Sequence, residues 1–238
     1  MANTKKEIQR YLVQQKYSSN RPTVLLLNGD AGTGKTTFAK AVAVSIGRES
    51  AIISLNGLQS GSDITGLSTH YRDSTGGAIS KAIIESGCFN PVIILDEIDK
   101  CAVDRENGLI WYSLLQLFDK NNCDFKYSFL DIYYDISQVI FIVTSNTIEN
   151  LPQPLLDRMK IVHLNGYNRI EKQEILSNYI LPQLYEDYDH ISKDLKLGET
   201  DKYFILENDK GSKGIRSIAK LAEEIYIDKI IDFESKNS

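Results

Sequence analysis

Cysteine is scarce in this sequence of 238 residues, and the few cysteines form no recognisable site. Cys88, Cys101 and Cys123 are odd in number and include no C-x-x-C pair. The sequence therefore indicates neither a disulfide framework nor a cysteine zinc site. The three histidines are dispersed and indicate no metal site either. We expect a protein of a reducing, intracellular compartment.

Long hydrophobic runs are also lacking. No apolar run approaches the length that is needed to cross a bilayer. The first residues, Met1–Glu7, carry positive charge but no apolar stretch follows them, so we expect no secretory signal. An apolar content of 42% with mixed charges is ordinary for a globular protein, and the length suits one large domain or one domain with a small appendage. We therefore expect a soluble, cytoplasmic protein without membrane attachment.

An excess of basic residues is missing as well. The sequence contains 27 Lys and Arg against 32 Asp and Glu, which gives a net charge of −5. This balance argues against broad electrostatic binding of nucleic acid, although it leaves room for a local basic patch. Long internal repeats and low-complexity linkers are absent too. Nucleic acid is therefore not among the partners that we expect.

What the sequence does contain is a phosphate-binding loop. Residues 29–36 read Gly-Asp-Ala-Gly-Thr-Gly-Lys-Thr, which is a complete G-x-x-x-x-G-K-[ST] motif. The motif follows the apolar run Val24–Leu27, and a helical pattern begins directly after it. A glycine-rich turn that binds nothing is the alternative, but strand, loop, Lys-Thr pair and helix all come in the order that binding requires. The chain is therefore predicted to bind a nucleoside triphosphate.

The residue types of this loop have physical reasons. Gly29, Gly32 and Gly34 lack a Cβ, so the loop can adopt positive φ and bring its backbone N–H groups against phosphate oxygens. The N-terminus of the following helix adds a partial positive charge. We expect Lys35 to reach the β- and γ-phosphates and the Thr36 hydroxyl to bind Mg²⁺.

Four further apolar runs are short enough to be buried strands, and helical stretches separate them. Each run is rich in β-branched residues and lacks polar alternation, as expected for strands covered on both faces of a parallel sheet. The pattern predicts an α/β fold, a three-layer P-loop sandwich with a central parallel sheet. The runs are Ala51–Leu55, Val92–Leu95, Val139–Val143 and Ile161–Leu164, and the helical stretches include Ala78–Glu85 and Leu109–Phe118.

The sequence changes character after Gly166. From Arg169 to Leu184 and from Gly214 to Ile231, apolar residues recur with a helical period, which predicts a small helical lid domain. Residues 5–15 predict a short helix before the nucleotide-binding domain. We interpret the acidic segment Tyr185–His190 as a solvated connector, with a recognition patch as the alternative. The predicted boundaries are 1–20 for the N-terminal extension, 21–166 for the nucleotide-binding domain and 167–238 for the lid.

Polar side chains end two of the predicted strands. Asp96 and Glu97 follow the run that begins at Val92. In a P-loop protein a strand-end Asp holds the Mg²⁺ shell, and Glu97 is then placed to polarise the attacking water as a general base. Acidic residues that cap a helix are the alternative, and Asp99 suits that role. Asn146 ends a later strand, where its amide could hold the water, although Asn is also a common turn residue there.

The order of these elements resembles an AAA+ ATPase module. Besides the loop and the two strand ends, the segment Leu155–Arg158 and a lid containing Gly214–Arg216 carry the resemblance. Several longer stretches are similar to the ATPase module of Lon proteases, and the resemblance as a whole covers about residues 24–232. These stretches are Leu95–Lys100, Asp131–Ser137, Pro154–Met159, Leu164–Tyr167 and Tyr179–Pro182.

The resemblance implies roles for individual residues. Asn146 stands at the sensor-1 position, and Arg158 stands at the arginine finger, which acts on the nucleotide of the neighbouring subunit. Arg216 matches the sensor-2 arginine of the lid, which would contact the γ-phosphate from the same chain. A surface salt bridge is the alternative for each arginine. The implied nucleotide-binding residues are Gly29, Asp30, Ala31, Gly32, Thr33, Gly34, Lys35, Thr36, Thr37 and Asp96; the catalytic residues are Glu97, Asn146, Arg158 and Arg216; and Thr36 and Asp96 are the ligands of Mg²⁺.

The resemblance also implies partners and limits. ATP and Mg²⁺ are the expected cofactors, and a finger acting in trans implies a homo-oligomeric ring, a hexamer in the family. The sequence stops at Ser238, so we expect neither the Ser-Lys peptidase domain of Lon nor its N-terminal substrate-binding region, and we expect an ATPase that is not a protease. Tyr71 falls at the substrate-gripping aromatic of the first pore loop, but Arg72 and Asp73 replace the usual aliphatic residue and glycine. Tyr71 could still grip a peptide, and an ordinary surface tyrosine is the alternative.

Three functions beyond ATP turnover are open. We predict a ring-forming ATPase that remodels a protein client and could serve a separate peptidase. A nucleotide-dependent assembly or scaffold module is the second interpretation. A nucleic-acid-directed AAA+ machine is the third, and the acidic charge balance disfavours it.

Overall fold

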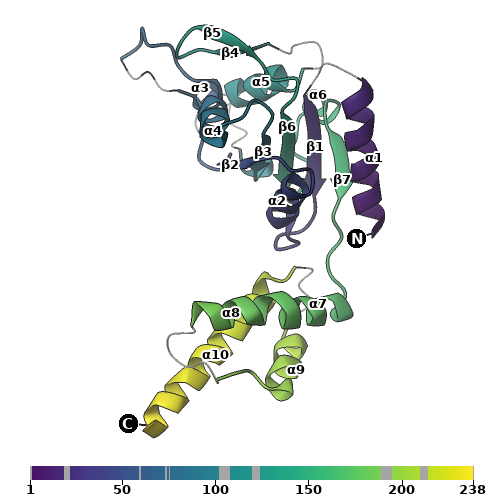
Figure 1. The fold of residues 1–238 in the computed structure, drawn as a ribbon, viewed down its shortest axis with the longest axis vertical. Coiled ribbons are helices and arrows are strands. Elements are labelled where there is room, and N and C mark those ends of the chain that lie inside the picture. Colours follow the sequence, from purple (N-terminus) through teal and green to yellow (C-terminus); the bar gives the residue numbers. More distant parts are fainter. Residues whose placement is uncertain are drawn as a thin grey trace. The chain divides into compact units, whose positions relative to one another are not determined.

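Two compact units make up the chain (Figure 1). The first consists of Met1–Gly29 with Lys35–Leu164, and the second of Asp30–Gly34 with Asn165–Ser238. The middle of the phosphate-binding loop therefore belongs to the second unit, while both ends of the loop belong to the first. The structure, a computed structural model, describes residues 2–18, 22–58, 60–72, 74, 76–101, 108–119, 124–188, 195–209 and 214–237.

A five-stranded parallel sheet forms the centre of the first unit. Its strands are β1 (Thr23–Asn28), β2 (Ser50–Ser54), β3 (Val92–Asp96), β6 (Ile140–Ser145) and β7 (Lys160–His163). The order is β2-β3-β6-β1-β7, so that β1 lies between β6 and β7, and β3 adjoins β6. β6 is buried along its whole length, and β1 and β3 are buried up to their final residue. The predicted parallel sheet is confirmed, since all five strands coincide with the apolar runs. The expectation that every strand is covered on both faces is wrong for β2, of which only Ile53 is buried, because β2 lies at the edge of the sheet.

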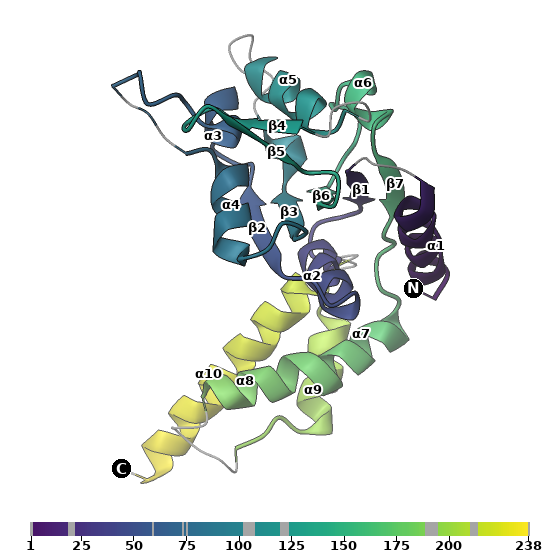
Figure 2. The ribbon, with the colours of Figure 1, turned by 45° about the horizontal axis from the view of Figure 1, so that its top comes forward.

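Helices cover both faces of this sheet and complete the three layers. They are α1 (Ala2–Ser18), α2 (Lys35–Ser45), α3 (Gly61–Thr65), α4 (Ala78–Ser86), the 3₁₀ turn η1 (Ile98–Lys100), α5 (Gly108–Leu117) and α6 (Gln153–Leu156). Successive residues of β1 face opposite layers. Val24 and Leu26 join a core with α4 and α5, whereas Leu25 and Leu27 join a second core with α2 and with Ile8 of α1. Figure 2 shows α4 beside β2 and α1 beside β7, at opposite edges of the sheet.

An antiparallel hairpin of β4 (Asp124–Tyr127) and β5 (Ile132–Asp135) is an element that the sequence did not predict. Two aromatic residues attach the hairpin to the rest of the first unit. The Tyr134 hydroxyl lies 3.1 Å from Ser80 Oγ of α4, and Phe125 is buried in the core that contains α4 and α5. The Tyr134 and Phe125 rings also contact each other within the hairpin, with centroids 5.4 Å apart. Tyr133 stays exposed near the tip.

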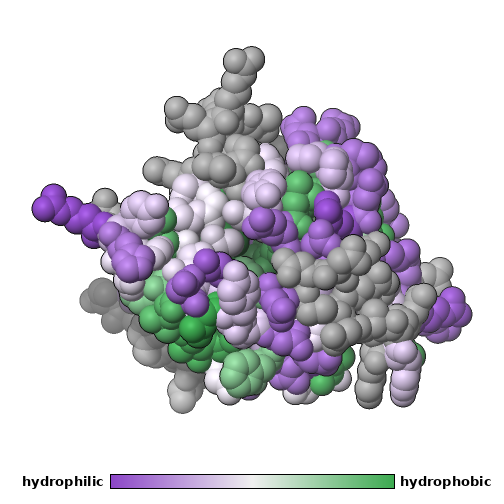
Figure 3. Space-filling model, turned by 90° about the horizontal axis from the view of Figure 1, so that it is seen from above, coloured by the Kyte–Doolittle hydropathy of each residue, from purple (hydrophilic) through white to green (hydrophobic). Residues whose placement is uncertain are grey.

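Hydrophilic side chains cover much of the face seen in Figure 3, and hydrophobic side chains gather in a patch at its lower left.

The second unit is helical, as predicted. It contains α7 (Arg169–Ile175), the π-helical turn η2 (Leu176–Ile180), α8 (Leu181–Asp187), α9 (Glu199–Glu207) and α10 (Arg216–Asn237). These elements form a core of their own, with Leu176 from η2, Ile205 from α9, and both Ile218 and Tyr226 from α10. The sequence prediction missed α9 because its residues are largely polar. None of the helices in the described ranges is long and apolar enough to cross a membrane.

Our interpretation of Tyr185–His190 as a solvated connector is wrong for its described part. Tyr185 lies in α8, and its ring centroid is 5.3 Å from that of Tyr226 in α10. Tyr188 meets the same ring at 5.8 Å. The Tyr185 hydroxyl also accepts a hydrogen bond of 3.0 Å from the Leu197 N–H. These half-buried tyrosines therefore pack against the core of the second unit. Residues 189 and 190 lie outside the described residues.

Candidate functional site

The phosphate-binding loop connects the end of β1 to the start of α2, and its glycines are sterically required. Gly32 and Gly34 have φ values of 78° and 77°, a left-handed conformation that side chains with a Cβ rarely adopt. Gly29 is needed for space instead, because a Cβ there would lie 2.4 Å from the carbonyl oxygen of Leu164. Within the loop, the Asp30 carbonyl accepts hydrogen bonds from the Thr33 N–H at 3.3 Å and the Thr33 hydroxyl at 2.8 Å. Ala31 lies between these residues, and Thr37 lies in the first turn of α2.

Lys35 is buried and joins the loop to the end of β6. Its Nζ donates hydrogen bonds to the Gly29 carbonyl at 2.7 Å and to Asn146 Oδ1 at 2.8 Å. Lys35 is only 8% exposed, so these oxygen partners replace the water that its ammonium group loses on burial. Two residues that we predicted to contact the nucleotide therefore touch each other, although 111 positions separate them in the sequence.

Asp96 joins the loop to the ends of two strands. Its Oδ1 accepts a hydrogen bond from the Thr36 hydroxyl at 2.9 Å and another from the Thr144 hydroxyl at 2.6 Å. The Thr144 oxygen in turn accepts the Glu97 N–H at 3.0 Å. Thr144 is a site residue that the sequence analysis missed; the only signal was a hydroxyl side chain near the end of an apolar strand.

Glu97 has an unusual backbone. Its φ and ψ are 59° and 51°, the left-handed region, which costs residues with a Cβ about 1–2 kcal/mol. Such strain occurs mainly at functional sites, where the surrounding structure imposes it. Here the Thr144 hydroxyl holds the Glu97 N–H and so fixes the point where the chain turns out of β3.

Asp99 contacts the predicted sensor residue. Its Oδ2 accepts a hydrogen bond of 3.3 Å from Asn146 Nδ2, while Asn146 Oδ1 accepts from Lys35. Asp99 Oδ1 is buried and has no partner among the described residues. Sequence reasoning considered Asp99 only as a helix cap. The structure instead shows a contact with Asn146, through which Asp99 orients the Asn146 amide.

Cys101 lies just beyond Asp99 and is buried. Its Sγ donates to the Leu55 carbonyl at 3.7 Å. Burial, and secondarily the negative charge of Asp99, raise the pKa of the Cys101 thiol to about 11. The thiol therefore stays protonated at neutral pH and is chemically unreactive.

The residues around Thr36 and Asp96 fit Mg²⁺. A hydroxyl oxygen and a carboxylate oxygen lie 2.9 Å apart at the end of the loop. Magnesium is usually held by one or two carboxylates together with substrate phosphates rather than by a complete protein cage. The described residues contain no cluster of three or more His, Cys, Asp or Glu that could hold a metal.

The two predicted catalytic arginines belong to different units and have different contacts. Arg158 donates to Asp119 Oδ2 at 3.4 Å and to the Pro154 carbonyl at 3.2 Å, so its contacts lie outside the loop. Arg216 begins α10 in the second unit, together with the middle of the loop. A Cβ placed on Gly32 would lie 3.3 Å from the Arg216 Cβ, so Arg216 adjoins the loop backbone.

Tyr71, the candidate pore-loop residue, lies in a turn and is 63% exposed. Arg72 is exposed as well, and residue 73 lies outside the described residues. The structure therefore leaves both interpretations of Tyr71 open as predictions.

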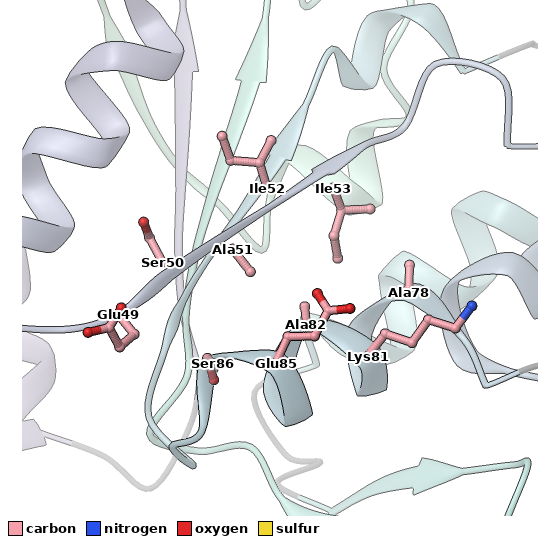
Figure 4. Close-up of a pocket in the computed structure, with 10 residues that line it drawn as sticks. All are labelled: Glu49, Ser50, Ala51, Ile52, Ile53, Ala78, Lys81, Ala82, Glu85 and Ser86. Carbon is pink, nitrogen blue, oxygen red and sulfur yellow. The ribbon is translucent and has the colours of Figure 1, made fainter.

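A hollow of about 400 Å³ lies elsewhere in the first unit, along the edge strand β2. Figure 4 shows α4 beneath this strand, with Lys81 and Glu85 among the side chains near the opening. None of the residues that line it belongs to the predicted nucleotide site. The hollow is therefore separate from the phosphate-binding chemistry.

The sequence of this chain is similar to those of Lon proteases from several organisms. The Lon protease of Brevibacillus choshinensis is 35% identical over 223 residues, which are 93% of this chain and 28% of that protein. Lon protease 1 of Bacillus subtilis is 33% identical over 92% of this chain and 29% of its own length. The peroxisomal Lon protease homolog 2 of Arabidopsis thaliana is 33% identical over 92% of this chain and 25% of its own length. The chain thus spans about a quarter of the length of these relatives.

The family itself follows from the nucleotide-binding part of the sequence. Residues 25–167 match the model of the "ATPase family associated with various cellular activities (AAA)". This range contains the whole phosphate-binding loop and the strand ends that carry Asp96, Glu97 and Asn146. The chain therefore belongs to the AAA family of ATPases, and its sequence is similar to the ATPase module of Lon proteases.

Proposed function

We propose that this chain binds ATP in the loop at residues 29–37 and hydrolyses it to ADP and phosphate. The observation that carries the proposal is a pair of hydrogen bonds: Lys35 to Asn146, and Thr36 to Asp96. Together they join the loop to the ends of β6 and β3, where the predicted catalytic side chains stand. Family membership supports the same reaction.

The residues suit an in-line attack of water on the γ-phosphate. The loop N–H groups and Lys35 would bind the phosphates, and Thr36 and Asp96 would hold Mg²⁺, which supplies charge neutralisation when bound. Glu97 would accept a proton from the water while the water oxygen forms a bond to the γ-phosphorus. The bond to the β–γ bridging oxygen breaks, and ADP leaves with that oxygen. Asn146, oriented by Asp99, would hold the water in line.

We further propose that Arg158 acts on the nucleotide of a neighbouring subunit in a homo-oligomeric ring, which by family resemblance is a hexamer. Its contacts with Asp119 and Pro154 lie away from the Lys35 and Asp96 group of its own unit. A heterologous ring would place it at the next nucleotide. Arg216, next to Gly32, would contact the γ-phosphate from the same chain.

The binding proposal is tested by Lys35→Ala, which should weaken ATP affinity by at least about tenfold because a charge-assisted contact to phosphate is lost. Glu97→Gln should retain binding and lower kcat by about 10²-fold or more, since the base is gone. Wild-type ATP affinity in Lys35→Ala, measured by calorimetry, would overturn the nucleotide site.

The finger is tested by mixing variants. Glu97→Gln carries an intact Arg158 and an inactive site, and Arg158→Ala carries the reverse. If Arg158 acts in trans, mixed assemblies should hydrolyse ATP several-fold faster than either variant alone. Arg10→Ala, an exposed change in α1, is the matched control and should behave as wild type. Absence of recovery in assemblies that are isolated through an affinity tag on one variant and shown by mass spectrometry to contain the other would exclude the trans role.

For the biological role we propose the remodelling of protein clients, supported by the similarity to proteins named Lon protease. We assign ATP turnover and no peptidase chemistry to these residues. An unfolded protein such as casein should stimulate ATP hydrolysis, and Tyr71→Ala should reduce the stimulation, whereas Tyr179→Ala, at a tyrosine that is 70% exposed in the second unit, should not. Stimulation by DNA instead would favour the nucleic-acid interpretation, and a Glu97→Gln protein that still supports the cellular role would favour the scaffold.

A further inference from the structure

Two successive carbonyl groups of the phosphate-binding loop accept hydrogen bonds from residues of the second unit. The Ile215 N–H donates to the Gly32 carbonyl at 3.1 Å. The Tyr167 hydroxyl donates to the Thr33 carbonyl at 2.9 Å, across 134 positions of sequence. All four residues belong to the same compact unit, so these contacts are internal to it.

Tyr167 is packed closely enough to hold this position. A Cβ on Gly34 would lie 3.0 Å from the Tyr167 hydroxyl oxygen, so the absence of a side chain at Gly34 makes room for the phenol. Burial, and secondarily the charge of Glu171, raise the pKa of Tyr167 above its ordinary value. The hydroxyl therefore keeps its proton, and remains a donor, throughout the neutral range.

The contact fixes the direction of an amide group. The Thr33 C=O and the Gly34 N–H belong to one planar peptide unit and point in opposite directions, because the bond is trans. Anchoring the carbonyl on Tyr167 thus directs the Gly34 N–H to the other side of the loop. Gly34 itself offers no resistance to rotation, since without a Cβ it adopts many conformations, and its φ of 77° needs external support.

We propose that Tyr167 is a positioning residue, which orients the Gly34 N–H toward phosphate by holding the Thr33 carbonyl. The inference rests on the proposed nucleotide binding and adds a residue that no motif identifies. Since the amide would contact ADP and ATP alike, Tyr167 contributes to ground-state and transition-state binding equally. Its loss should therefore raise KM and leave kcat nearly unchanged.

The test compares Tyr167→Phe, which keeps the ring and removes only the hydroxyl, with Tyr179→Phe, an exposed tyrosine of the same unit. Tyr167→Phe should raise the KM for ATP and the Kd for ADP, measured by calorimetry, by about three- to tenfold, the effect of one hydrogen bond. Its kcat should stay within about twofold of wild type, and Tyr179→Phe should change neither constant. A merely structural role would lower the thermal midpoint and the active fraction while KM and Kd stayed at wild-type values.

The outcomes separate this inference from the proposed function. If Lys35→Ala loses nucleotide affinity and Tyr167→Phe binds ADP with wild-type affinity, the role of Tyr167 is wrong and the nucleotide site stands. If Lys35→Ala also binds ADP normally, the site itself is wrong. A fall in kcat at unchanged KM in Tyr167→Phe would equally overturn the positioning role.

Discussion

The Thr144 hydroxyl donates to Asp96 at 2.6 Å and accepts the Glu97 N–H at 3.0 Å. One side chain thereby positions both acidic residues of the strand end. Thr144→Val has nearly the same shape and removes both hydrogen bonds. We expect kcat for ATP to fall by about tenfold and the free energy of unfolding to fall by about 1–2 kcal/mol, because the Glu97 N–H loses its acceptor.

Thr144→Ser is the control, since it keeps the hydroxyl, and it should retain most of the activity. Steady-state ATPase assays and urea unfolding measure the two effects. Wild-type kcat in a folded Thr144→Val protein would show that this contact does not position the carboxylates.

Asp99 should matter for turnover although it is not a predicted catalytic residue. Asp99→Asn keeps the shape of the side chain. If its amide oxygen accepts the hydrogen bond from Asn146, its NH₂ group occupies the buried Oδ1 position, where no acceptor is available. We expect kcat to fall several-fold, with ATP affinity within about twofold of wild type. Asp228→Asn, an exposed change in α10, should have no effect on kcat in the same assay. A loss confined to ATP affinity would contradict the orienting role.

The left-handed backbone of Glu97 predicts an inverted order of stability. Glu97→Gly should be more stable than Glu97→Ala by about 1 kcal/mol, because glycine adopts a φ of 59° without strain. In the exposed helical position Glu224 the order should be reversed, with alanine about 1 kcal/mol more stable than glycine. Urea unfolding of the four variants measures both differences. Neither Glu97 variant should hydrolyse ATP, and equal stability of the two would contradict the observed backbone.

Gly214 should tolerate no side chain. A Cβ there would lie 2.4 Å from the Ala31 carbonyl oxygen and 2.8 Å from the Gly32 carbonyl carbon. Gly214→Ala should therefore displace the loop backbone, at a cost of about 1–3 kcal/mol, and weaken ADP binding by about tenfold. Gly198→Ala is the matched control, because the nearest atom to its added Cβ is 3.6 Å away. Unchanged calorimetric affinity in Gly214→Ala would show that the loop is not packed there.

Cys101 makes stability depend on pH above 9. Its pKa is raised from 9.0 to about 11 in the folded protein, so its contribution is complete below pH 9 and is lost as the pH rises toward 11. The loss should be on the order of 2 kcal/mol. Other groups also titrate in this range, so the measured quantity is the difference in unfolding free energy between wild type and Cys101→Ala. That difference should change in favour of Cys101→Ala between pH 8 and 11, and a constant difference would contradict the shifted pKa.

The central strands β1, β3 and β6 could be predicted from sequence because both of their faces are covered. Runs such as Val24–Leu27 are uniformly apolar for that reason, and their order with the helices indicates a parallel sheet. The hairpin of β4 and β5 escaped prediction because charged and aromatic residues alternate over strands as short as Asp124–Tyr127. Helix α9 escaped prediction because its apolar residues do not recur with a helical period: they follow one another directly, from Tyr203 to Leu206.

The loop and the strand-end residues of the site could also be located from sequence. Spacing identifies Lys35, and strand ends identify Asp96 and Asn146. The sequence could not show that β1 lies beside β6, which is what brings Asn146 to Lys35. Thr144 and Tyr167 were missed for the same reason, because their roles depend on partners far away in the chain.

The division of the loop between the two units has a consequence for truncation. The chain passes between them after Gly29, before Lys35 and after Leu164. A fragment that ends at Leu164 would retain every residue of the phosphate-binding motif, yet the Gly32 and Thr33 carbonyls would lose their donors. The motif therefore depends on hydrogen-bond donors from outside its own sequence, and a fragment without the residues after Leu164 lacks both of them.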